Sequence, residues 1–120
     1  MIFTEPNRAG EFLLTEVSPQ FRENVTVAEG QDLPAGAVVA KLTAGGKFVA
    51  LDPEADSTGA EVAAGVLYSA VNATESDKPG LIISRLAVVN GAALTWPEGI
   101  SGGDKADAVA ALELKFLIVR

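Results

Sequence analysis

The acidic segment 52–61 is the densest cluster of possible metal ligands in the sequence. Its carboxylates stand at spaced positions, as in calcium-binding loops, and belong to Asp52, Glu54, Asp56 and Glu61. However, serine holds the sixth position, where such loops need glycine, and a proline stiffens the start. The flanking segments do not have a helical pattern either. We therefore expect a solvated acidic turn and no metal ion.

Two further motifs are associated with chemistry in other proteins. Asp104-Lys105-Ala106 matches the tripeptide that bears lipoate in swinging-arm domains, where the lysine projects from a tight hairpin. Here Lys105 falls in the first turn of an expected helix, so we expect no lipoate. Trp96-Pro97 suggests ligand stacking, but we favour a core or interface aromatic at a strand end, where proline stops the ladder. The sequence predicts no cofactor and no small-molecule substrate.

Histidine and cysteine are both absent from the 120 residues. Their absence excludes Ser–His–Asp and Cys–His catalysis, thiol chemistry and disulfide bonds. Lone carboxylates and Tyr68 are all that an enzyme would have, so we expect no enzymatic activity.

The charge and hydropathy of the chain narrow its possible partners. A formal net charge of −7 argues against nucleic acid, because neutralising phosphates requires a basic face. No apolar run approaches the roughly 20 residues of a membrane-spanning helix, and no signal peptide opens the chain. We therefore expect a soluble protein that is made in a cytoplasm and has no membrane partner.

The chain has the composition of one globular domain, with 48% hydrophobic and 21% charged residues. Two glycines in Ala44-Gly45-Gly46 predict a tight hairpin between its flanking strands. Small residues at 63–65 indicate that another backbone approaches closely there. Further β-prone runs lie between turn residues. The expected strands fall within residues 24–28, 37–43, 47–52, 61–72, 80–89 and 116–119.

One helix is expected near the C-terminus. Ser101 begins a capping pattern with Asp104, so its side-chain oxygen is placed to accept from orphan amide groups. Apolar residues then recur at helical spacing and predict the buried face. They are Ala106, Val109, Ala110, Leu112 and Phe116. The predicted fold class is mainly β with one short C-terminal helix.

Residues 1–20 have a pattern of their own. Large apolar side chains stand between turn-formers and charges, too interrupted for a helix and too apolar for a solvated tail. One interpretation is an extended arm that binds another protein, in front of a β-rich domain at 21–120. The other is the first strand of the domain's own sheet.

Three stretches resemble the head-decoration protein D family of tailed phages, the trimeric capsid-stabilising proteins of the lambda type. They are GKFVALD (46–52), AEVAAGVL (60–67) and LTWPEGIS (94–101), the last leading into an alanine-rich helix. Their order and spacing agree with the family over roughly residues 37–111.

The resemblance implies a β-clip (β-tulip-like) fold and a homotrimer. It also implies binding to the major capsid protein at three-fold and quasi-three-fold positions on the outside of the expanded capsid. There the protein would stabilise the head against the pressure of packaged DNA, and the N-terminal arm would add β-structure to the capsid protein. The implied location is the outer surface of the virion, after synthesis in the host cytoplasm.

The contact residues are predicted on physical grounds, because the arm does not align with the family residue by residue. The expected capsid-binding residues are Ile2, Phe3, Thr4, Phe12, Leu13 and Leu14. The expected trimer contacts are Ala64, Gly65, Leu67, Trp96 and Pro97. The alternative is a small β-rich virion module that binds carbohydrate or a host surface, with Trp96 exposed in a cleft and the arm an ordinary strand.

Overall fold

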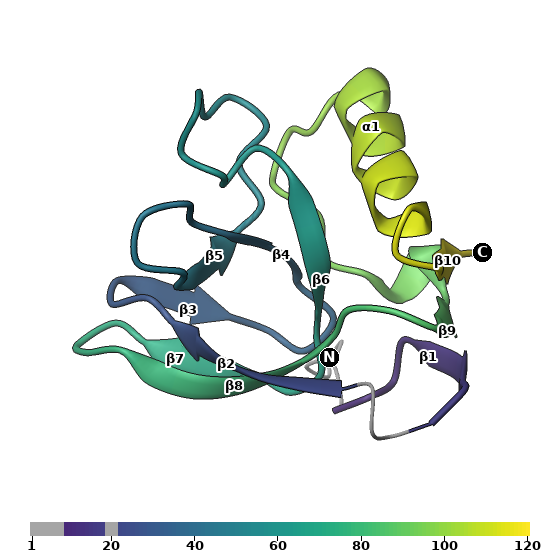
Figure 1. Cartoon of the computed structure of the whole chain (residues 1–120), viewed down its shortest axis with the longest axis horizontal. Helices are drawn as coiled ribbons and strands as arrows, with labels where there is room; N and C mark the ends of the chain where they lie inside the picture. The colour runs from purple at the N-terminus through teal and green to yellow at the C-terminus, as the bar shows by residue number, and fades with distance from the viewer. Residues whose placement is uncertain (1–8, 19–21) are drawn as a thin grey trace, which may run out of the picture.

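A computed structural model describes residues 9–18 and 22–120 of the chain (Figure 1). Within these residues the protein is mainly β, with one α-helix near the C-terminus, as the sequence predicts. The strands are β1 Leu13–Glu16, β2 Arg22–Val27, β3 Gln31–Leu33, β4 Val38–Lys41, β5 Phe48–Ala50, β6 Ala63–Leu67, β7 Val71–Ala73, β8 Lys78–Ile83, β9 Ala87–Val89 and β10 Leu117–Val119. The helices are the 3₁₀ turn Gly91–Ala93 and α1 Gly102–Glu113.

A closed barrel, in the order β2-β5-β4-β6-β8, forms the larger part of the structure. β2 lies antiparallel to β8 along its whole length, from Arg22 opposite Ile83 to Val27 opposite Lys78. The small sheet of β3 and β7 lies beside it (Figure 1). One apolar cluster fills this region, and its fully buried members include Val27, Val39 and Leu67.

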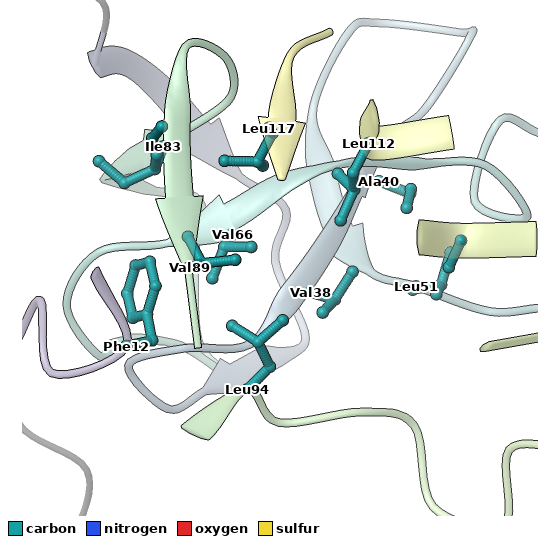
Figure 2. Packing of buried hydrophobic residues seen from close by; sticks show 13 residues of the cluster. Phe12, Val38, Ala40, Leu51, Val66, Ile83, Val89, Leu94, Leu112 and Leu117 are labelled. Atoms are coloured by element: carbon teal, nitrogen blue, oxygen red, sulfur yellow. The ribbon is translucent and has the colours of Figure 1, made fainter. Parts of the chain in front are cut away.

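A second sheet, in the order β1-β9-β10, packs with α1 over the other cluster. β1 runs antiparallel to β9, whereas β10 runs parallel to it. Figure 2 shows Phe12, Leu112 and Leu117 from the chain ends meeting Val66 and Ile83 from the barrel. The two ends of the sequence are therefore held together by shared burial of apolar surface.

The expected hairpin at 44–46 is confirmed. β4 and β5 are antiparallel, with Lys41 opposite Phe48, and both glycines of the connection have positive φ. The apolar runs 61–72 and 80–89 are each divided into two strands, β6 with β7 and β8 with β9. In the second run the break coincides with Leu86, whose φ of 54° lies outside the extended region.

The close approach expected at 63–65 comes from within the chain. A Cβ on Gly65 would lie 2.9 Å from the carbonyl oxygen of Ile83, so β6 and β8 leave no room for a side chain. No helix in the described part of the chain is long and apolar enough to cross a membrane.

The cap of α1 is as expected, and its buried face is as expected only in part. The Ser101 Oγ accepts from the backbone N–H of Asp104 at 3.1 Å. The helix buries Ala108 and Leu112, while Ala106 and Ala110 are exposed. The expected burial of Leu112 is therefore confirmed and that of Ala106 and Ala110 is wrong, while Phe116 cannot belong to the helical face because α1 ends at Glu113 and Phe116 has a left-handed conformation.

Candidate functional site

The beginning of the described chain is held tightly against the barrel. The N–H of Gly10 donates to the carbonyl oxygen of Tyr68 at 2.9 Å, and Gly10 has a φ of 69°. A Cβ at this position would lie 2.8 Å from the Tyr68 ring. The guanidinium of Arg22 covers the same ring at 4.5 Å. The place of Gly10 against the barrel is therefore defined, whereas the expected contacts Ile2, Phe3 and Thr4 lie outside the described residues.

The other expected arm contacts are distributed between the core and the surface. Phe12 is 1% exposed and lies within the core cluster, and its carbonyl oxygen accepts from the N–H of Asn90 at 2.7 Å (Figure 2). Leu13 packs partly against that cluster, whereas Leu14 is 56% exposed. Residues 13–16 thus form a strand of the domain's own sheet. In this packing Phe12 is unavailable to another protein, while Leu14 is accessible.

The expected trimer contacts also differ in accessibility. Leu67 and Gly65 are buried within the protomer, whereas Ala64 and Pro97 are partly exposed. Trp96 packs against the core cluster, and Lys105 lies over its ring at 5.1 Å from the centroid. Its indole N–H is buried and has no hydrogen-bond partner in the described part of the chain.

The acidic segment uses its carboxylates to shape its own backbone. Glu61 accepts from the N–H groups of Thr58 and Gly59, and Asp52 accepts from the N–H of Glu54. The residues that the structure describes contain no group of three or more acidic side chains placed to hold a metal ion.

The structure reveals an apolar surface that the sequence reading missed. We call it the outer face: the side of the β1-β9-β10 sheet that carries Thr15, Val17, Leu86, Val88, Phe116 and Ile118, all of which line one hollow of about 400 Å³. Val88 is paired with Thr15 on one side and Ile118 on the other. The alternation of these residues with the buried Ala87, Val89 and Leu117 was the available signal. In the sequence both segments read simply as apolar runs.

Charged groups lie at the edge of the outer face. Arg22 Nη2 lies 2.6 Å from Glu16 Oε1, and this hydrogen bond is the main reason that the pKa of Arg22 is raised. A second hollow, of about 440 Å³, is lined by Glu23, Ser84, Arg85, Leu86, Lys115 and Phe116. Phe116 therefore borders two hollows, one mainly apolar and one with two basic side chains and one acidic side chain.

The chain is similar to known proteins at the level of a family. A comparison with curated proteins found no match. The family model of the bacteriophage lambda head decoration protein D matches residues 2–116, nearly the whole chain. That family consists of structural proteins of the phage capsid, which suggests a capsid role and a non-enzymatic one. The chain belongs to the bacteriophage lambda head decoration protein D family.

Proposed function

We propose that this protein binds as a homotrimer to the outside of an expanded phage capsid, at its three-fold and quasi-three-fold positions, and stabilises the head against internal DNA pressure. The observation that carries the proposal is the family match, which begins at residue 2 and so includes the arm. The β-clip fold and the partners implied by the resemblance, the major capsid protein and two further copies, belong to this proposal. So does the location on the outer surface of the virion after synthesis in the host cytoplasm.

The arm supplies the attachment by adding β-structure to the capsid protein. Ordering one residue costs about 1–2 kcal/mol of backbone entropy, and burying Ile2 or Phe3 returns about 1.5–3 kcal/mol each. Main-chain hydrogen bonds of an added strand contribute the rest. A single arm therefore binds weakly. Three arms on one trimer bind at high effective concentration, so trimerisation is part of the attachment mechanism.

The folded domain limits how much of the chain must order at the capsid. Residues 9–18 already pack or pair within the domain, as the burial of Phe12 and the pairing of β1 with β9 demonstrate. Only the residues before Ala9 remain for the arm, together with the accessible Leu14. This reduces the entropic cost of attachment relative to an arm of twenty residues. For the trimer, the partly exposed Ala64, Trp96 and Pro97 are the contacts that we retain.

The proposal is tested by mixing the purified protein with expanded and unexpanded capsids of the cognate phage and sedimenting the particles. We expect saturable binding to expanded capsids only, and greater resistance of the decorated particles to heating. Equal binding to both forms, or binding without any gain in resistance, would contradict the proposal.

The carbohydrate-binding alternative receives no support from the position of Trp96. That hypothesis needs an indole ring exposed in a cleft. The ring instead packs against the core cluster, and Lys105 lies over its face. We therefore do not propose it.

A further inference from the structure

Exposed apolar side chains are concentrated at the β1-β9-β10 sheet. Among the described residues five large hydrophobic side chains are exposed, and four of them, Leu14, Val17, Leu114 and Phe116, lie in or next to β1 and β10. Leu114 is 84% exposed, Val17 71% and Phe116 68%. The fifth, Val62, lies in the loop before β6, outside this sheet. Clustered apolar exposure of this kind marks an interaction surface.

Two residues at this surface have energetically unfavourable backbone conformations. Leu86 and Phe116 have φ values of 54° and 60°, a region that bulky residues rarely adopt. Both conformations are fixed by pairing between segments. The Phe116 carbonyl oxygen accepts from the N–H of Ala87 at 3.2 Å, and that of Leu86 accepts from Val17 at 2.9 Å. The side chains of two core-type residues are thereby directed to the surface.

The place where the described chain begins indicates which protein covers the outer face. Arg8 is five residues before Leu13, the first residue of β1, and five residues span at most about 17 Å. The turn in which Leu13 N–H donates to the carbonyl oxygen of Gly10 shortens that span further. A protein that binds the arm as far as Arg8 therefore has part of its surface within about 17 Å of Leu13, where β1 begins.

We propose that the outer face is a second contact with the major capsid protein, made by the folded domain in addition to the arm. This inference rests on the proposed function. The partner surface has apolar side chains that enter the hollows beside Phe116, and a carboxylate that faces Lys115. The second hollow is lined by two basic side chains, Lys115 and Arg85, and one acidic side chain, Glu23, and an acidic group is the complement of the exposed Lys115.

The first test compares Phe116→Asn with the matched control Val62→Asn. Asparagine tolerates the left-handed region, so the first variant removes the ring without imposing new strain. Val62→Asn removes an exposed apolar side chain that lies outside the sheet and lines neither hollow. Thermal melting and sedimentation velocity establish folding and oligomeric state, and titration of expanded capsids gives the half-saturation concentration.

We expect both variants to fold and to remain trimeric. The half-saturation concentration should rise at least tenfold for Phe116→Asn, as for a central anchor of an interface, and less than twofold for Val62→Asn. Unchanged capsid binding by Phe116→Asn would overturn the inference. Dissociation of that variant to monomers would also overturn it, by making the outer face a contact between copies.

A second pair of variants tests the charge at the rim. Lys115→Glu should weaken decoration more than Lys78→Glu, which makes the same change in net charge at an exposed position of β8. Equal effects would mean that Lys115 acts only through the net charge of the protein. They would contradict the predicted carboxylate partner. If the unaltered protein decorates no capsid, the proposed function itself is wrong. If it decorates capsids and the Phe116 and Lys115 variants bind equally well, only this inference is wrong.

Discussion

Gly10 and Tyr68 are in direct backbone contact, with the Gly10 N–H 2.9 Å from the Tyr68 carbonyl oxygen and its Cα facing the Tyr68 ring. The contact joins the start of the described chain to the residue directly after β6. It fixes the position of Gly10, two residues after the end of the proposed arm, so both its strength and its geometry bear on where that arm is attached to the domain.

Substitution of Gly10 should be costly. In Gly10→Ala the new Cβ would lie 2.8 Å from the Tyr68 ring, which Arg22 covers on one face, and the residue would keep a positive φ. We expect a loss of about 1–3 kcal/mol in the free energy of unfolding. Gly30→Ala is the matched control, because Gly30 has a φ of 97° with nothing within 4 Å of its Cβ position. Urea unfolding of both variants should show the larger loss for Gly10→Ala, and equal losses would contradict the tight contact.

Phe12 should contribute mainly to stability. Removing a fully buried ring in Phe12→Ala leaves a cavity and should lower the free energy of unfolding by about 3–5 kcal/mol. Leu14→Ala, two residues later on an exposed position, should change it by less than about 1 kcal/mol. Chemical denaturation of the isolated protein measures both. If Phe12→Ala were as stable as the parent, the Phe12 ring would not be part of the core. Phe12 would then again be a candidate contact with the capsid.

The ion pair between Lys47 and Asp77 should give a small dependence of stability on acid pH. The two side chains are 2.6 Å apart, and the Asp77 carboxylate also accepts from the N–H of Glu29. The hydrogen bond from Lys47, followed by that from Glu29, lowers the pKa of Asp77 below its ordinary 3.8.

A lowered pKa means that the stabilising contribution is complete above the unfolded-state value and is lost as the pH falls through the folded-state value. We therefore expect the stability of the parent protein to fall below about pH 4 more steeply than that of Asp77→Asn. Urea midpoints measured between pH 2 and pH 7 test this. Parallel pH profiles would show that the pair contributes nothing measurable.

Phe3 should matter more for decoration than the acidic loop. Phe3→Ala removes an aromatic side chain from the proposed arm, whereas Glu54→Ala removes an exposed carboxylate from a loop with no proposed partner. We expect at least a tenfold rise in the half-saturation concentration for Phe3→Ala, and little change for Glu54→Ala. The isolated Phe3→Ala protein should unfold like the parent. If the two variants decorated equally well, the arm would lose its proposed role.

The features that could be predicted from the sequence are those determined by residues close together in the chain. The 44–46 hairpin and the Ser101 cap were predictable because each is determined by residues within one turn. The packing of Phe12 was not, since it depends on partners such as Leu112 and Leu117, about a hundred residues later. The same applies to the pairing of β1 with β9, which turns part of the expected arm into a strand.

The outer face was missed for a related reason. Val88 and Ile118 become neighbours only because β9 and β10 pair in parallel. No local pattern indicates that register. The exposure of Phe116 depends further on its left-handed backbone, whereas the sequence predicted a place on the buried face of the helix and in a β-prone run at 116–119. The sequence therefore predicted that the candidate site lies near the start of the chain. It did not predict which residues the fold leaves accessible there.

The most direct test of the central claim is deletion of residues 2–8 followed by titration of expanded capsids. The chain that remains keeps Gly10, Phe12 and β1, so it should fold and trimerise like the parent, as thermal melting and sedimentation velocity would show. Its half-saturation concentration should rise by at least a hundredfold, because three linked arms are lost at once. Decoration at normal occupancy and affinity by the shortened trimer would contradict the account.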